Sequence, residues 1–306
     1  MHWSTVQRIV GMLLMLFSIT MLPGLLLAWI YQDGQIRVFA ASLVIILLAG
    51  GLLWLPVRRA SHELRTRDGF LIVVLFWGVL GLAGALPLVL SDDLPVSLTD
   101  AVFESLSGLT TTGATVLTGL DHLPESIRFY RQQLQWLGGM GIIVLAVAIL
   151  PMLGIGGMQL YRAETPGPVK DTKLTPRIAE TAKTLWLLYL VLTVACAAAY
   201  WLAGMTLFDA VGHSFSTVAI GGFSTYDASI GHFDSPLISL VCVAFMLIAA
   251  INFAMHFAAW RDKSLRSYLY DPETRWFFGI TGGVVVVTVA TLWLTLPGYG
   301  FGGSLH

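Results

Sequence analysis

Long apolar runs alternate with short polar segments along the whole chain. A helix of about 20 apolar residues crosses the ~30 Å hydrocarbon core of a bilayer. Seven runs reach that length, and we expect a membrane span in each of them: Ile9–Ile30, Ile36–Leu55, Phe70–Leu90, Leu134–Leu153, Thr184–Ala203, Leu237–Trp260 and Trp276–Leu296. The pattern therefore predicts an all-α polytopic membrane protein with about seven transmembrane helices.

Two connecting segments, Ser91–Gln133 and Gly204–Pro236, differ from ordinary loops. They are too apolar to be fully solvated and too interrupted to be spans. Each begins with a helical pattern of about ten residues, roughly 15 Å long, and then continues into Thr, Ser and Gly. A half-helix followed by irregular backbone at membrane depth is typical of a re-entrant pore loop, so the sequence predicts two re-entrant half-helices.

The two segments are copies of each other at a shift of 109 positions. Because both have the same orientation in the membrane, they indicate parallel span–pore loop–span repeats. We expect an N-terminal two-span hairpin over 1–60, repeats over 61–165 and 166–265, and the first span of an incomplete third repeat over 266–306. The matched residues are Leu98, Asp100, Ala101, Val102, Ser105, Ser107 and Gly113 with Leu207, Asp209, Ala210, Val211, Ser214, Ser216 and Gly222.

Composition and charge support a membrane protein and suggest its orientation. Hydrophobic residues make up 56% of the chain and charged residues 11%, whereas soluble domains carry about 25% charged residues. The net charge of −1 argues against a nucleic-acid partner. Basic residues gather after the second, fourth and sixth spans, and the intervening loops hold only Arg37, Arg128 and Arg131. The positive-inside rule then places the N-terminus in the cytoplasm.

The irregular parts of the two loops predict a cation site. Unpaired backbone groups cost several kcal/mol each in hydrocarbon, so such a segment must be buried in protein or line an aqueous path. Small side chains and a glycine would let carbonyl groups replace the water around a cation, and the C-terminal dipole end of each half-helix would favour positive charge. We expect Asp100 and Asp209 to be N-caps. The alternative to a cation site is that each loop is a glycine-rich turn buried between helices. The predicted ligand positions are Thr110, Thr111, Thr112, Gly113, Ala219, Ile220, Gly221 and Gly222.

Glu104 and His213 occupy the same position in the two repeats. Ionisable groups at membrane depth are costly and usually functional. We expect them to brace the filter backbone through hydrogen bonds; direct contact with the ion is the alternative. Asn252 and His256 lie one helical turn apart, and we expect interhelical hydrogen bonds from them rather than metal binding.

Four stretches resemble the Trk potassium-uptake family, specifically its TrkH-type membrane subunit within the TrkH/TrkG/KtrB/HKT superfamily. They are FESLSGLTTTGAT (Phe103–Thr115), QWLGGMGIIVLAVAILP (Gln135–Pro151), GGMQLYRAETPGP (Gly156–Pro168) and GHSFSTVAIGGFST (Gly212–Thr225). The resemblance implies a hairpin followed by four repeats around one pore, with Gly113 and Gly222 as filter glycines. It also implies a homodimer in the bacterial inner membrane, with a cytosolic nucleotide-binding regulatory ring as a partner.

The resemblance implies passive uptake of K⁺, with K⁺ as the transported ion, no organic cofactor and no enzymatic activity. Family members are longer, so the chain is expected to be C-terminally truncated and to hold two of four filter loops. One alternative is a non-conducting fragment or assembly subunit. A remote alternative is an intramembrane serine hydrolase that uses His213 and Ser214.

Overall fold

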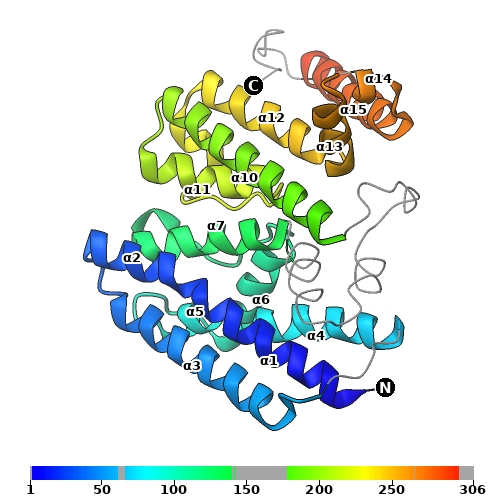
Figure 1. Cartoon of the computed structure of the whole chain (residues 1–306). Coiled ribbons are helices and arrows are strands. Elements are labelled where there is room, and N and C mark those ends of the chain that lie inside the picture. Colours follow the sequence, from blue (N-terminus) through cyan, green and yellow to red (C-terminus); the bar gives the residue numbers. More distant parts are fainter. Residues whose placement is uncertain (1, 61–65, 140, 142–177, 265, 296–306) are drawn as a thin grey trace. The chain divides into compact units, whose positions relative to one another are not determined.

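The computed structural model describes residues 2–60, 66–139, 141, 178–264 and 266–295 (Figure 1). Within these ranges the regular elements are helices, which confirms the predicted all-α class. The chain divides into two compact units, Met1–Met246 and Leu247–His306. The helices are α1 Trp3–Ile19, α2 Met21–Tyr31, α3 Ile36–Trp54, α4 Thr66–Gly84, α5 Leu86–Leu90, α6 Leu98–Leu109, α7 Glu125–Gly139, α10 Ile178–Leu202, α11 Leu207–Val218, α12 Pro236–Ala250, α13 Phe253–Asp262, α14 Arg266–Tyr270 and α15 Pro272–Thr295.

Five helical segments in the described ranges are long and apolar enough to cross a membrane. They correspond to the first, second, third, fifth and seventh predicted spans, with small shifts at their ends. The fourth predicted span, Leu134–Leu153, lies mostly outside the described residues, and only its beginning is seen as the last part of α7. The five segments are Trp3–Tyr31, Ile36–Val57, Arg67–Leu90, Lys183–Leu202 and Pro272–Thr295.

The sixth predicted span, Leu237–Trp260, is wrong as a continuous helix. It breaks between α12 and α13, where the Ile251 N–H bonds the Ile248 carbonyl at 3.2 Å and the Asn252 carbonyl starts α13 by accepting from the Met255 N–H at 2.8 Å. The Ile248 carbonyl also lies 3.0 Å from Nε2 of His256. A side-chain partner for a carbonyl at the helix end stabilises the break.

Asn252 and His256 make hydrogen bonds to neighbouring helices, as the sequence predicts. Nδ2 of Asn252 lies 3.5 Å from Oε2 of Glu273 on α15. Nδ1 of His256 lies 2.9 Å from the hydroxyl of Tyr268 on α14. Across the described part of the chain, no group of three His, Cys, Asp or Glu residues could hold a metal ion.

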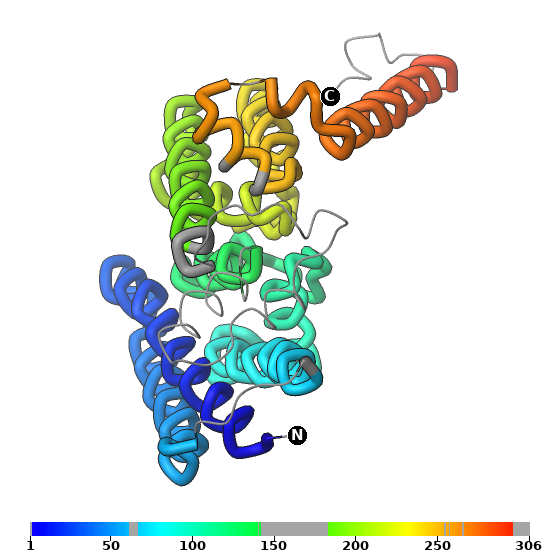
Figure 2. The backbone as a smooth tube through the Cα atoms, turned by 45° about the vertical axis from the view of Figure 1, so that its right-hand side comes forward, coloured from blue at the N-terminus to red at the C-terminus, as the bar shows by residue number. Residues whose placement is uncertain are grey.

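In the first unit, α1 and α3 pack lengthwise against each other (Figures 1 and 2). A Cβ on Gly11 would come within 2.8 Å of the Gly50 carbonyl, and one on Gly50 within 2.7 Å of the Gly11 carbonyl. Because neither residue has a side chain, the two backbones can touch, as small residues commonly allow between membrane helices. Helix α4 packs against α1, and α7 packs against α2, so this N-terminal hairpin supports both of them.

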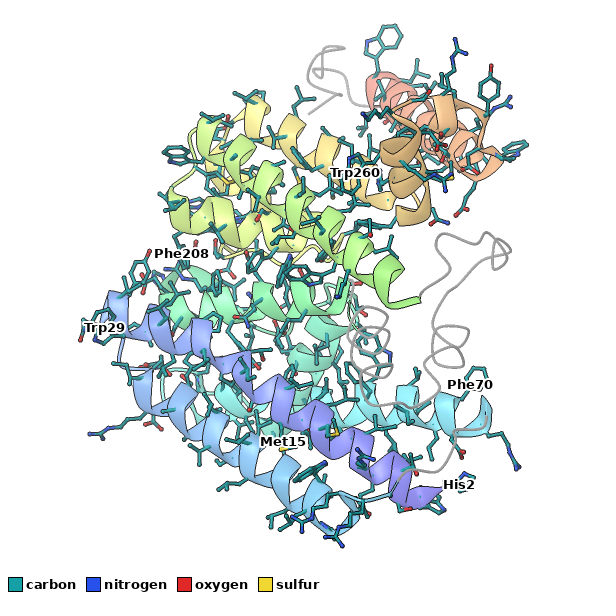
Figure 3. All side chains as sticks on the ribbon, viewed as in Figure 1. His2, Met15, Trp29, Phe70, Phe208 and Trp260 are labelled. Carbon is teal, nitrogen blue, oxygen red and sulfur yellow. The ribbon has the colours of Figure 1, made fainter. Side chains whose placement is uncertain are left out.

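The beginning of α7 is anchored to that hairpin and to α11. Oδ2 of Asp33, in the connection between α2 and α3, accepts a hydrogen bond from the Ser126 N–H at 2.9 Å. Phe208 on α11, labelled in Figure 3, packs against Phe129 on α7, with ring centroids 6.5 Å apart. Helix α7 therefore runs between the hairpin and α11, in a position to contact both loops.

Candidate functional site

The two half-helices begin with the same capping arrangement. Ser97 and Thr206 are the N-caps, and their side-chain oxygens accept from the N–H groups of Asp100 and Asp209, each at 3.1 Å. The expectation that these aspartates are N-caps is therefore wrong, because each lies three residues after its N-cap. A hydroxyl can accept from the backbone there, while a carboxylate in the first turn interacts favourably with the helix dipole.

The backbone after each half-helix follows the same course. Thr111 and Ile220 both have φ 53°, and Gly113 and Gly222 have φ 74° and 85°. The two positions in each pair are 109 residues apart, the offset found in the sequence. The N–H of Thr112 bonds the Ser107 carbonyl at 2.9 Å, and the N–H of Gly221 bonds the Ser216 carbonyl at 2.8 Å. The copies thus share a backbone conformation as well as a sequence pattern.

The two irregular segments, 110–113 and 219–222, lie beside each other. A Cβ added to Gly113 would overlap the Gly221 carbonyl oxygen. Neither segment is wound into α-helix. Thr110, Thr112 and Gly222 are exposed in the chain, and the Thr110 hydroxyl is engaged within its own loop, 2.7 Å from the Leu106 carbonyl. The structure therefore brings the predicted ligand positions of both loops together.

Glu104 is buried and bonds the segment that follows the first loop. Its Oε1 and Oε2 accept from the Thr115 hydroxyl at 2.9 and 3.1 Å, and Oε2 also accepts from the Val116 N–H at 3.2 Å. The Thr115 oxygen in turn accepts from the Leu117 N–H at 3.1 Å. Glu104 thus holds the chain immediately after Gly113.

His213 makes the corresponding contacts in the second copy. Its Nδ1 lies 2.9 Å from the Asp209 carbonyl and its Nε2 lies 2.9 Å from the Ser224 hydroxyl. A carbonyl can only accept, so Nδ1 carries a proton and, in the neutral ring, Nε2 accepts from Ser224. Ser224 is the counterpart of Thr115, and its oxygen accepts from the Tyr226 N–H at 3.1 Å. A carboxylate and an imidazole therefore make equivalent hydrogen bonds after the two loops.

Arg131, on α7, lies beside Glu104 and was missed by the sequence analysis, which counted it only as a loop charge. Both side chains are fully buried, and Nη2 of Arg131 lies 2.6 Å from Oε1 of Glu104. The guanidinium also donates to the Ser224 carbonyl at 3.0 Å. A basic residue three positions before an apolar run was the available signal, since charges at membrane depth are usually paired.

The C-terminal half of α7 also contacts both loops. Oε1 of Gln135 accepts from the Phe223 N–H at 3.0 Å. A Cβ on Gly138 would overlap the Leu109 carbonyl at the end of α6, and one on Gly139 would come within 2.9 Å of the Ala219 Cβ. Close approach of α7 to both half-helix ends therefore depends on two consecutive glycines.

Beyond the loops, one polar contact joins the two connecting segments, and another ties the end of the second loop to its own half-helix. Oδ1 of Asp227 accepts from the Leu120 N–H at 3.2 Å. The Tyr226 hydroxyl donates to Oδ2 of Asp209 at 3.2 Å. Burial, and then the negative charge of Asp209, raise the pKa of Tyr226, so its hydroxyl remains a donor at neutral pH.

Ser214 and His213 are not arranged as a nucleophile and its base. The Ser214 hydroxyl donates to the Val211 carbonyl in its own helix at 2.7 Å. The His213 nitrogens lie next to Asp209 and Ser224 instead. A serine nucleophile needs a base within hydrogen-bond reach, so this geometry gives no support to the hydrolase alternative.

Comparisons with known proteins agree on one family. A family model described as TrkH, cation transport protein, matches residues 35–297. A Trk system potassium uptake protein TrkH from Halomonas elongata is 62% identical over 96% of this chain and 61% of its own length. A Trk system potassium uptake protein TrkG from Escherichia coli K12 is 45% identical over 95% of this chain and 60% of its own.

A solved structure has the same fold. The crystal structure of the potassium transporter TrkH from Vibrio parahaemolyticus matches with a TM-score of 0.87 and 54% identity, covering 100% of this chain and 62% of that one. This chain therefore spans about three fifths of the length of these relatives. The matched family consists of transport proteins and not of enzymes.

Proposed function

Because the chain belongs to the TrkH family of cation transport proteins, we propose that it takes part in potassium uptake across the bacterial inner membrane. In this proposal K⁺ is the transported ion and moves passively inward along the membrane potential, worth about 2.3 kcal/mol per charge for each 100 mV. The multi-pass fold supports the location. We place the N-terminus in the cytoplasm, as the basic loops indicate.

One observation carries the proposal: two non-helical segments of equal conformation meet at Gly113 and Gly221. Irregular backbone in a membrane protein is tolerated where it is buried in protein or lines an aqueous path. Carbonyl oxygens can replace the water shell of an alkali cation. We assign the K⁺ ligands to the main-chain oxygens of Thr110, Thr111, Thr112, Gly113, Ala219, Ile220, Gly221 and Gly222.

The elements around these segments favour a cation. Helices α6 and α11 end at Leu109 and Val218, directly before the two segments, and the C-terminal end of a helix carries partial negative charge. Glu104 and His213 act as braces in this proposal, because their polar atoms already bond the chain after each loop. A full carboxylate charge on the ion would also slow its release.

The wider assembly follows the family arrangement. We propose a hairpin over 1–60, repeats over 61–165 and 166–265, and the first span of a third repeat over 266–306. Two loops form part of a four-loop filter, and the proposed partners are a second copy of the chain and a cytosolic nucleotide-binding regulatory ring. Because two loops do not encircle an ion by themselves, the second candidate function is a non-conducting assembly subunit.

The test compares two proteins reconstituted in liposomes. One is the 306-residue chain, and the other, called here the chimera, continues this chain with the part of the Halomonas elongata relative that follows the matched region. Uptake of ⁸⁶Rb⁺ by the chain alone supports conduction at this length. Uptake by the chimera alone supports the assembly role. Absence of uptake from both, with the Halomonas elongata relative active in the same assay, contradicts the proposed function.

A further inference from the structure

We infer that Arg131 is a positioning residue for ion selectivity, because its guanidinium fastens the two loop backbones to each other. This inference rests on the proposed function and deepens it. Arg131 is on α7, outside both loops, and has no exposed surface. Its contacts reach one residue of the first half-helix and residues that follow each loop.

On the side of the first loop, Arg131 contacts Glu104 and Thr115. Its Nε donates to Oε1 of Glu104 at 2.8 Å, and Nη2 lies 2.6 Å from the same oxygen. Nη2 also donates to the Thr115 hydroxyl at 3.1 Å. Charged hydrogen bonds of this kind are about twice as strong as neutral ones. The non-helical, non-sheet segment 110–117, called here the first strand, is therefore held firmly against α7.

On the side of the second loop, the same guanidinium contacts Phe223 and Ser224. Its Nη1 donates to the Ser224 carbonyl at 3.0 Å, and its central carbon lies 4.5 Å from the centre of the Phe223 ring. Thr115 and Ser224 each lie two residues beyond the filter glycine of their own loop. Arg131 therefore joins the first strand to its counterpart 219–226, called here the second strand, at equivalent positions.

The positive charge of Arg131 is balanced where it lies. Its carboxylate partner is also completely buried. Oε2 of Glu104 accepts from Thr115 and Val116, so both carboxylate oxygens have protein donors. The pair as a whole therefore adds no net charge beside the proposed ion path.

The geometry requires arginine rather than any cation. Guanidinium offers five donors in a rigid planar fork, whereas the ammonium of lysine is a single point of charge. Arg131 uses three separate nitrogens toward Glu104, Thr115 and Ser224. A lysine at this position can keep the ion pair with Glu104, but it cannot also hold the second strand. The R131K variant therefore keeps the charge balance with Glu104 and removes the contact with the second strand.

The first measurement is the K⁺/Na⁺ permeability ratio of the R131K variant in whichever of the chain and the chimera conducts. We expect the ratio to fall by up to about tenfold, because losing one charged hydrogen bond just beyond the filter frees the backbone that holds the proposed ion ligands, while expression and oligomeric state are kept. R128K is the matched control, since Arg128 is a buried arginine on the same helix whose ionic partner is Glu125. It should keep the ratio. A folded R131K with an unchanged ratio overturns the inference.

Two further arms keep the test decisive. If R131K does not fold, the neutral pair R131M/E104Q replaces it, and the same fall in ratio is expected. Hydrogen exchange in the purified 306-residue chain provides a readout that does not require transport. Amides of both 114–117 and 223–226 should exchange faster in R131K than in the unsubstituted chain. Unchanged exchange at 223–226 overturns the inference. If neither the chain nor the chimera takes up ions but exchange rises in both segments, only the proposed function is contradicted.

Discussion

Gly113 in the first loop lies so close to Gly221 in the second that a Cβ on Gly113 would overlap the Gly221 carbonyl oxygen. The two residues are 108 positions apart in the chain, and each follows its own half-helix. The contact is backbone to backbone. It sets the separation of the two strands where the proposed ion passes, and a side chain on Gly113 would have to displace the backbone of the second loop.

Substitution at Gly113 tests that contact. We expect Gly113→Ser to reduce the K⁺/Na⁺ permeability ratio of the conducting protein and to destabilise it by about 1–3 kcal/mol, because a side chain must displace the neighbouring strand and adopt a strained φ. Gly119→Ser is the matched control, since Gly119 has φ 71° but nothing within 4 Å of its would-be Cβ. Equal permeability ratios in the two variants would contradict the filter assignment.

The ion pair of Glu104 and Arg131 should be costly to break from one side. We expect Glu104→Gln to lower stability by about 3–5 kcal/mol, because a buried guanidinium is left without its counter-charge. The double variant E104Q/R131M should lose less than the sum of the two single changes. Thermal unfolding in detergent measures both effects.

Glu125→Gln is the control for that experiment. Its carboxylate pairs with Arg128 at 3.1 Å, but the Glu125 side chain is 35% exposed. Solvent reaches the carboxylate of this pair and screens its charge, so the pair contributes about 0–1 kcal/mol and the Tm should barely change. A loss of stability in Glu125→Gln as large as that in Glu104→Gln would show that burial is not what makes the Glu104–Arg131 pair important.

His213 and its neighbour Ser214 should behave differently. We expect His213→Ala to destabilise the protein by about 1–3 kcal/mol and to reduce ion selectivity, because the Ser224 hydroxyl and the Asp209 carbonyl lose their partner. Ser214→Ala removes a bond within one helix turn, so stability should change by less than about 0.5 kcal/mol. Labelling of Ser214 by a serine-reactive probe would instead favour the hydrolase alternative.

Ile220 should be strained in the folded protein. It has φ 53°, which β-branched residues rarely adopt. We expect Ile220→Asn to raise stability by about 1 kcal/mol, since Asn tolerates this conformation better, and to reduce selectivity by loosening the second strand. Val116→Asn is the control, because both side chains are 45% exposed and Val116 has no positive φ. Stabilisation of similar size at Val116 would rule out backbone strain as the cause.

The half-helices and the offset between the copies could be predicted from sequence because they depend on local patterns. Helix α6 covers Leu98–Leu109 and α11 covers Leu207–Val218, at the offset that the matched residues indicate. For Asp100 and Asp209 the sequence predicts the correct helix ends but the wrong cap position, because Ser97 and Thr206 are equally suitable caps. Helix termini are the least certain part of such predictions.

Arg131 and the break at Asn252 could not be predicted in the same way. The partners of Arg131 on the second strand lie about 90 residues further along the chain, and only the fold brings them together. The apolar run from Leu237 to Trp260 gives no sign that His256 will bond the Ile248 carbonyl and end a helix there. Hydropathy records how apolar a window is, and it does not record which carbonyl finds a partner.

The left-handed conformations at Thr111 and Ile220 have a practical consequence for anyone who engineers this protein. Both copies keep a β-branched residue at a left-handed φ that Gly or Asn would adopt with less strain. A search for heat-resistant variants would therefore enrich changes at these two positions early. We expect the selected proteins to be easier to purify and crystallise, but to admit sodium more readily than the parent.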